Sequence, residues 1–147
     1  MEQQANKSFK KYKTKYIRKL GRKALSNIEI DEVATKLLGS KYKGSFAQNE
    51  KFPKLSGYYI INTDLKTGPG IHWISLIQTP KYAYIYDSFG RDTKKIAPYL
   101  VRYLHPRKIV ESKNDKEQKD AEVICGHLSL AWMAVAHELG IKAAILI

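Results

Sequence analysis

The sequence predicts an α+β domain, in which strands and helices occupy different stretches of the chain. Residues 57–86 contain short runs rich in Ile and Tyr that are bounded by turn residues, and such runs indicate strands. Residues 125–139 place apolar side chains at helical spacing. The length of 147 residues, 44% of them hydrophobic, suits one compact domain with a buried core.

The helices are predicted from capping signals and apolar spacing. Residues 26–39 form the first, because Ser26 and Glu29 fit the reciprocal capping pattern that opens a helix. A second is predicted over residues 93–103. Residues 125–139 form the most apolar helix, which is expected to be central to the core, with a buried side of Leu128, Ala131, Trp132, Val135 and Leu139.

The strands are predicted from β-branched and aromatic residues that lie between turn signals. We expect strands over residues 57–62, 71–77, 82–86 and 107–110. The second and third of these are separated by Gln78-Thr79-Pro80-Lys81 and are therefore predicted to pair as a β-hairpin. Turns or loops are expected over residues 40–56, 68–70 and 113–120.

Positive charge is concentrated at the N-terminus. The chain has a net charge of +12, and residues 1–24 hold nine Lys or Arg with Glu2 as their one acid. Apolar residues spaced by three and four predict a helix here once the segment meets a partner or the protein body. Alone, residues 1–24 are predicted to be a flexible arm that precedes a domain of residues 25–147. The arm is either a solubilising tail or a contact for duplex DNA, and its predicted DNA-binding residues are Lys10, Lys11, Lys13, Lys15, Arg18, Lys19, Arg22 and Lys23.

Several functional classes are excluded by the sequence. Cys125 is the sole cysteine, so neither an intramolecular disulfide nor a multi-thiolate zinc site can form. The four histidines are scattered, and no metal cofactor is predicted. No apolar run approaches the roughly 20 residues that cross a bilayer, and the Lys-rich N-terminus lacks the apolar core of a secretory signal. We therefore expect an intracellular protein that does not associate with membranes.

The predicted hairpin brings a histidine and a carboxylate together. If its centre lies between Thr79 and Pro80, His72 stands opposite Asp87 on one face of the sheet. The carboxylate would then fix the ring tautomer and stabilise the imidazolium that forms when the other ring nitrogen takes a proton. The alternative interpretation is a structural His–Asp bridge at a sheet edge.

Cys125 is a candidate for the nucleophile that such a pair activates. At the first turn of a helix its sulfur faces backbone N–H groups and the positive end of the helix dipole, which favour the thiolate. Gly126 beside it lets a substrate carbonyl approach closely. Gln118, in the preceding loop, is a candidate donor to an oxyanion together with the Cys125 N–H. The alternatives are an inert, packed cysteine and a solvated glutamine.

These residues together resemble a known family. The segments Gly70-Ile71-His72-Trp73 and Tyr84-Ile85-Tyr86-Asp87-Ser88-Phe89-Gly90, followed by Gln118 and by Cys125-Gly126, are similar to the motifs of the adenain-like maturation cysteine proteases of viruses. Leu38-Gly39, Phe52-Pro53 and Ile61-Asn62-Thr63 extend the resemblance upstream. The order His, acid, Gln, Cys is shared with the related proteases of ubiquitin-like proteins. Asp87 stands where adenain has Glu.

The resemblance implies a fold and a set of roles. The fold is a mixed β-sheet packed on a central helix that begins at the nucleophile. His72 is implied to be the general base, Asp87 its orienting acid, Cys125 the nucleophile and Gln118 an oxyanion donor, while Trp73 shelters the imidazole. No cofactor is required for the chemistry. DNA and an activating peptide act as cofactors in the family, and with a single cysteine any such peptide must bind here noncovalently.

The function implied is a thiol endopeptidase that cleaves viral capsid or core precursor proteins at glycine-containing sites during virion maturation. The protein is then expected to be a monomer, located in the nucleus or viral factory of the infected cell and packaged in the virion. Two alternatives are retained. One is a protease of ubiquitin or SUMO-like proteins with the same site, and the other is a basic, non-enzymatic DNA-binding virion protein.

Overall fold

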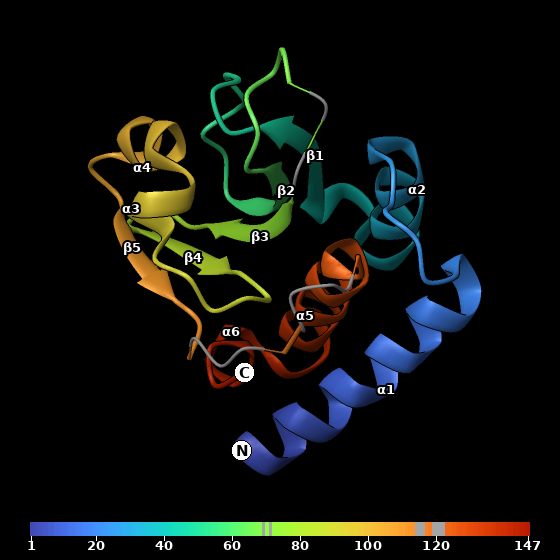
Figure 1. Ribbon diagram of the computed structural model, residues 1–147. Helices are drawn as coiled ribbons and strands as arrows, with labels where there is room; N and C mark the ends of the chain where they lie inside the picture. Colours follow the sequence, from blue (N-terminus) through green and yellow to red (C-terminus); the bar gives the residue numbers. More distant parts are fainter. Residues whose placement is uncertain (69, 71, 114–116, 119–122) are drawn as a thin grey trace.

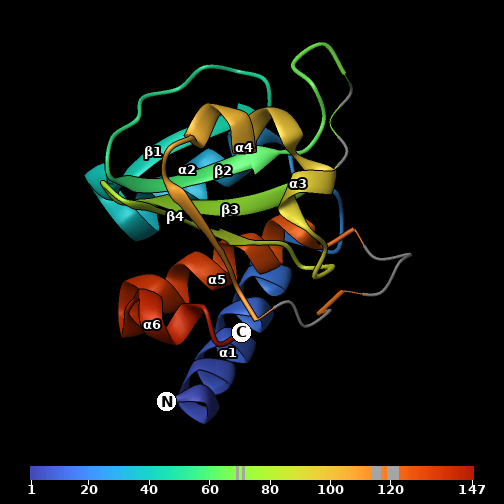
Figure 2. The same cartoon turned by 90° about the vertical axis from the view of Figure 1, so that its left-hand side faces the viewer.

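The computed structural model describes residues 1–68, 70, 72–113, 117–118 and 123–147. Its centre is a five-stranded sheet in the order β1-β2-β3-β4-β5, with helices on both faces (Figures 1 and 2). The β1–β2 and β4–β5 pairs are parallel, and the β2–β3 and β3–β4 pairs are antiparallel. The strands are β1 (Tyr42–Ala47), β2 (Gly57–Asn62), β3 (Trp73–Gln78), β4 (Tyr82–Tyr86) and β5 (Lys108–Glu111). The predicted α+β class with a mixed sheet is confirmed.

The helices divide into two groups, one on each face. Figure 2 shows α3 and α4 above the sheet and α5, α6 and α1 below it. On the face of α5, β2 and β3 contribute alternate residues such as Ile60 and Ile77, whereas Ile61 and Leu76 belong to the other core. The helices are α1 (Glu2–Leu20), α2 (Asn27–Leu38), α3 (Thr93–Ile96), α4 (Pro98–Leu104), α5 (Cys125–Leu139) and α6 (Ile141–Ala144), with a 3₁₀ turn η1 (Gly39–Lys41).

Local sequence signals set the helix ends. The Glu29 N–H donates to the Ser26 hydroxyl at 3.2 Å, and the Ser26 N–H donates to the Glu29 carboxylate at 3.1 Å, which confirms the predicted capping box. Helix α2 ends at Gly39, which takes a positive φ of 58°. The apolar helix α5 has the predicted span.

The β3–β4 hairpin forms, but its register is two residues from the predicted one. Ile77 pairs with Tyr84 instead of Tyr82, so the turn is centred between Pro80 and Lys81. The Thr79 N–H donates to the Tyr82 carbonyl at 2.9 Å and its hydroxyl accepts from the Tyr82 N–H at 3.1 Å. A shift of two residues keeps every side chain on its face of the sheet, because side chains alternate with period two.

Two predicted elements differ from the structure. The expected loop over residues 40–56 contains β1, whose sequence Tyr-Lys-Gly-Ser-Phe-Ala has no alternation of polar and apolar residues that would indicate a strand. The expected helix over residues 93–103 is two helices that meet at Ala97-Pro98. Pro69 of the predicted turn, Ile71 of the predicted strand and residues 114–116 and 119–120 of the predicted loop lie outside the described residues.

The N-terminal segment forms the helix that its apolar spacing predicts once it meets the protein body, and it is not a separate arm. Residues 2–20 form α1, which runs along α5 on the side away from the sheet (Figure 1). Phe9 and Tyr16 are 5% and 3% exposed, and the Phe9 ring meets the edge of Tyr86 with 6.0 Å between centroids. Burial of this apolar stripe orders the helix, so α1 packs as part of the domain and its buried face joins the core. No described helix is both long and apolar enough to span a membrane.

Candidate active site

The candidate site lies where β3 begins and β4 ends. His72 directly precedes β3 and Asp87 directly follows β4, and both are buried, at 4% and 5% exposure. His72 Nε2 lies 2.5 Å from Asp87 Oδ1. The two residues meet as the sequence predicts, but as a diagonal contact past the strand ends and not as a directly opposed pair.

Asp87 is held by its own turn as well as by His72. The Gly90 N–H donates to the Asp87 carbonyl at 2.9 Å, and the carboxylate accepts the Arg91 N–H at 2.9 Å and its Nε at 3.0 Å. Burial alone would raise the pKa of this carboxyl, but the hydrogen bonds from His72 and Arg91 hold its pKa below the usual range. Asp87 is therefore a fixed anion behind the imidazole.

Cys125 is the first residue of α5, and its thiol lies within hydrogen-bonding reach of the His72 ring. Burial opposes ionisation of the thiol. The hydrogen bond and charge of His72, with the backbone N–H groups of Trp73 and Gly126, outweigh that effect and lower the Cys125 pKa below its ordinary value. The described residues thus favour the thiolate, which is the reactive form of a cysteine.

His72 shows the complementary shift. Burial lowers the pKa of the ring, but bonds to Asp87 and Cys125 raise it by more, so the net pKa lies above its ordinary value. Because Nε2 bonds Asp87, Nδ1 is the ring nitrogen left to exchange a proton with the thiol. The Phe89 ring packs beside the imidazole, with centroids 5.1 Å apart. The raised pKa of His72 and the lowered pKa of Cys125 both favour a thiolate–imidazolium pair.

Gln118 joins the site through Ser88, the residue after Asp87. It is buried at 3% exposure, and its Oε1 accepts the Ser88 hydroxyl at 2.6 Å. The neighbouring Glu117 N–H donates to the Ser88 carbonyl at 2.9 Å. All four predicted catalytic residues are therefore linked: His72 contacts Asp87 and Cys125, and Gln118 is bonded to the residue next to Asp87.

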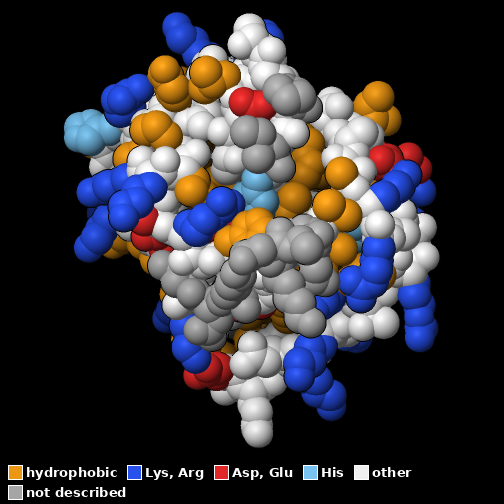
Figure 3. All heavy atoms as spheres, in the orientation of Figure 1, with side chains coloured by type: hydrophobic (Ala, Val, Ile, Leu, Met, Phe, Trp, Pro, Cys, Tyr) orange, Lys and Arg blue, Asp and Glu red, His pale blue; other side chains and the backbone are white. Residues whose placement is uncertain are grey.

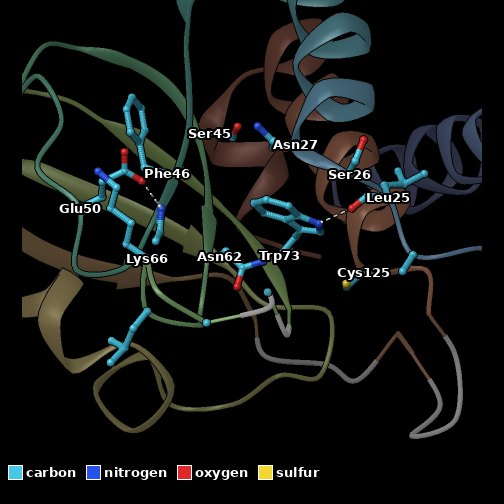
Figure 4. Close-up of a pocket in the computed structure, with 15 residues that line it drawn as sticks. Leu25, Ser26, Asn27, Ser45, Phe46, Glu50, Asn62, Lys66, Trp73 and Cys125 are labelled. Atoms are coloured by element: carbon cyan, nitrogen blue, oxygen red, sulfur yellow. Dashed lines mark hydrogen bonds between the residues drawn. The ribbon is translucent and has the colours of Figure 1, made fainter.

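A cleft of about 540 Å³ opens beside the Cys125 sulfur. Figure 4 shows Cys125 at one end, Glu50 and Lys66 at the other, and Trp73 and Asn62 between them. Its walls come from the segment 24–27, from β1 and from the β2–β3 loop. An extended chain laid along this cleft would reach the sulfur at one end.

The wall nearest the sulfur is fixed by the segment that joins α1 to α2. Trp73 donates its indole N–H to the Leu25 carbonyl at 2.9 Å (Figure 4). His127, fully buried on α5, has Nε2 at 2.7 Å from the Gly21 carbonyl. The interpretation that Gly126 leaves room for a substrate needs correction, since a Cβ there would meet the Leu25 side chain at 3.0 Å. The glycine admits Leu25, which in turn lines the cleft.

Three residues of this site were not predicted from the sequence. Arg91 braces Asp87, Ser88 bonds Gln118, and Leu25 supports Trp73. The sequence does contain a signal for Arg91 and Ser88. Asp-Ser-Phe-Gly is typical of a tight turn in which the Asp side chain bonds the backbone that follows it. Leu25 had none, since its contact joins segments 48 residues apart.

The predicted DNA-binding residues are only partly gathered on one surface. Lys10, Lys11, Lys15, Arg18 and Lys19 line one outward face of α1 together with Lys7 and Thr14, which were not among the predicted residues. We call these seven residues the α1 stripe. The other three predicted residues, Lys13, Arg22 and Lys23, lie outside this stripe. Lys23 forms an ion pair with Glu29 at 2.8 Å, and Arg22 also has an interaction partner.

Among the residues described, no group of three or more His, Cys, Asp or Glu is placed to hold a metal ion. No protein-family model matches the chain, and no curated protein matches it either.

Proposed function

We propose that the protein is a cysteine endopeptidase with Cys125 as nucleophile and His72 as general base and acid. The observation that carries the proposal is the contact chain from the partly exposed Cys125 thiol through the buried His72 to the buried Asp87, with 2.5 Å between the last two. A thiol, an imidazole and a carboxylate in this order form the catalytic arrangement of thiol peptidases.

The reaction follows from these contacts. The Cys125 thiolate attacks the scissile carbonyl carbon, and the carbonyl electrons move to oxygen, where the Gln118 amide and the Cys125 N–H would donate to the oxyanion. Collapse expels the amine, which takes the proton held by the His72 imidazolium, and leaves a thioester on Cys125. His72 then takes a proton from water, whose oxygen attacks the thioester and releases the acid and the thiolate.

The substrate class rests on the resemblance and on the cleft. Trp73 and Leu25 line the cleft together with Cys125, and we expect them to limit the size of the side chains accepted next to the scissile carbonyl. We propose cleavage of virion precursor proteins at glycine-containing sites during maturation in the infected cell. Proteases of ubiquitin-like proteins also need a cleft that admits glycine. Labelling of Cys125 by a ubiquitin-like vinyl sulfone would favour that alternative.

The direct test is cleavage of a co-expressed capsid precursor by the wild type and by Cys125→Ala. We expect the variant to retain its melting temperature and to lose all processing, because the attacking sulfur is gone. Undiminished processing by the variant would overturn the proposal. Met133→Ala, fully buried farther along α5, is the control for loss of stability without loss of the nucleophile.

A second candidate function, polyanion binding, is favoured by the α1 stripe. Its six cations occupy one face of a helix whose opposite face is buried. Figure 3 shows blue Lys and Arg side chains along the lower right, where α1 runs in Figure 1. Such a row binds phosphates with an affinity that falls steeply with salt. Lys10→Gln with Lys15→Gln should weaken duplex DNA binding and reduce the salt slope, whereas Lys36→Gln on α2 should not.

A further inference from the structure

We infer that Arg91 is a positioning residue whose guanidinium fixes the orientation of the Asp87 carboxylate, so that one oxygen stays directed at His72. The inference rests on the proposed function and deepens it. Arg91 lies outside the described lining of the cleft beside Cys125, whereas its side chain bonds Asp87 directly. Its part in the reaction would therefore be exerted through Asp87.

The two carboxylate oxygens of Asp87 have different partners. Oδ1 lies 2.5 Å from His72 Nε2. Oδ2 accepts the Arg91 backbone N–H at 2.9 Å and Arg91 Nε at 3.0 Å, and both of its donors within the described part of the chain thus belong to Arg91. Arg91 Nη2 lies 3.4 Å from Oδ1, so the guanidinium spans the two oxygens. A two-donor fork of this kind restrains a carboxylate against rotation.

The aspartate side chain does not set this orientation by itself. Its terminal torsion is broad and roughly two-fold, so the carboxylate can turn about the bond that carries it. Without the guanidinium, the described donors left beside His72 are two backbone N–H groups, those of Phe89 at 3.3 Å and Arg91 at 2.9 Å. A carboxylate that turns would weaken the bond that stabilises the His72 imidazolium.

The guanidinium is itself held in place, although the Arg91 side chain is 44% exposed. Its central carbon lies 4.8 Å from the centroid of the Phe89 ring, and that ring packs on the His72 imidazole with 5.1 Å between centroids. Arginine suits both contacts, because its planar group bonds a carboxylate through two donors and stacks on an aromatic ring. A lysine ammonium carries the same charge without the fork.

The charged groups around the pair give the sign of the expected pH effect. Against the effect of burial, hydrogen bonds from His72 and Arg91 lower the pKa of Asp87. Likewise against burial, bonds to Asp87 and Cys125 raise the pKa of His72. If the carboxylate turns away, the imidazolium loses stabilisation and the Cys125 thiolate titrates at higher pH. If Arg91 acted by its charge alone, its removal would strengthen the effect of Asp87 on the ring and move that titration to lower pH.

The test compares Arg91→Gln and Arg91→Lys with the wild type in peptide cleavage and in the pH profile of Cys125 alkylation by iodoacetamide. We expect Arg91→Gln to lower kcat by about 10- to 100-fold, the range found when a residue that orients a metal ligand is replaced. KM should change little, and the alkylation profile should move to higher pH. Arg91→Lys should lie nearer to Arg91→Gln than to the wild type, because it keeps the charge but loses the fork.

Arg102→Gln is the matched control. Arg102 on α4 stacks on Tyr99 with the same 4.8 Å from its guanidinium carbon to the ring centroid. Its kcat and alkylation profile should equal those of the wild type. In an Asp87→Asn background, Arg91→Gln should cause no further loss of kcat, because a residue that acts through the carboxylate then has nothing left to position.

The outcomes separate the role of Arg91 from the function on which it rests. A wild type that neither cleaves peptides nor titrates below a free thiol would remove the proposed function, and the role of Arg91 with it. With an active wild type, an unchanged or lowered alkylation profile in Arg91→Gln would overturn that role alone, even if the variant melts at a lower temperature. Activity of Arg91→Lys equal to the wild type, or an additive loss in the Asp87→Asn background, would overturn it as well. If Arg91→Gln does not fold, Arg91→Lys decides by the same two readouts.

Discussion

The two faces of the sheet hold their helices through different contacts. Toward α3 and α4, Leu100 and Leu104 pack over Ile74 and Leu76, and the buried Gln48 bonds the backbone of Ile96 and Tyr99, each at 3.2 Å. Toward α5 the core also contains polar bonds between β3 and the helix: Ser75 donates to the Ser129 carbonyl at 2.8 Å, and the Ser129 hydroxyl donates to the Trp73 carbonyl at 3.1 Å. The first core supplies stability, whereas the second also fixes Cys125 relative to His72.

The largest effect is expected when the Asp87 carboxylate, which contacts His72, is replaced by an amide. Asp87→Asn should lower kcat by up to about 10⁴-fold, the loss seen when the orienting acid of a catalytic triad becomes an amide. The amide can no longer stabilise the His72 imidazolium or hold its tautomer. Steady-state cleavage of a peptide substrate measures the loss.

Asp92→Asn is the matched control for that substitution. Asp92 caps α3 through the Lys94 N–H at 3.0 Å, and asparagine caps equally well. Its activity should therefore equal the wild type. Equal activity of Asp87→Asn and the wild type would remove the carboxylate from the mechanism.

A core substitution on the opposite face should affect stability alone. Leu100 is fully buried against the α3–α4 side of the sheet. Leu100→Ala should lower the free energy of unfolding by roughly 2–5 kcal/mol. Urea unfolding followed by circular dichroism measures the loss. The pH dependence of Cys125 alkylation in the folded variant should be unchanged, and a shifted profile would mean that the two faces are coupled.

Gly126→Ala probes the contact between α5 and the cleft wall. The new Cβ would lie 3.0 Å from Leu25, so one of them must shift, at a cost of about 1–3 kcal/mol. Because Leu25 also supports Trp73, we expect KM to rise as well. Leu25→Ala combined with Gly126→Ala should recover part of the lost stability. A double variant less stable than both single ones would contradict the contact.

The smallest effect is expected at one polar bond between β3 and α5. Ser75→Ala should cost about 1 kcal/mol of unfolding free energy, because it removes a buried hydrogen bond. Unlike Leu100→Ala, it should also slow Cys125 alkylation, since α5 is less firmly placed against β3. Unchanged alkylation would show that packing alone positions the nucleophile.

The elements with local signals were predictable. Ser26 and Glu29 specify the start of α2, and uninterrupted apolar spacing specifies α5. The His72–Asp87 pair was reached despite a wrong register, because an error of two residues leaves both side chains on one face. Gln118 was predicted as a candidate from its place before Cys125, and its bond to Ser88 fits that role without showing it.

The remainder depended on contacts that the sequence does not encode locally. β1 lacks alternation and is a strand because it pairs with β2. The α1 segment was predicted to be an arm because charge dominates its composition, yet Phe9 and Tyr16 are buried by packing on a helix more than 100 residues away. Leu25 was missed for the same reason. Tertiary burial overrides local propensity at each of these positions.

The central claim is that the Cys125 thiol, with His72 beside it, is ionised at neutral pH. The pKa of the thiol is lowered and that of His72 is raised, and both shifts favour the thiolate–imidazolium pair over the neutral pair. The deciding measurement is the rate of Cys125 alkylation by iodoacetamide against pH, in the wild type and in His72→Gln. We predict that the wild-type rate titrates well below the pKa of about 8.5 of a free thiol, and that His72→Gln moves it back up. A wild-type titration at or above the free-thiol value, unchanged by His72→Gln, would contradict the account.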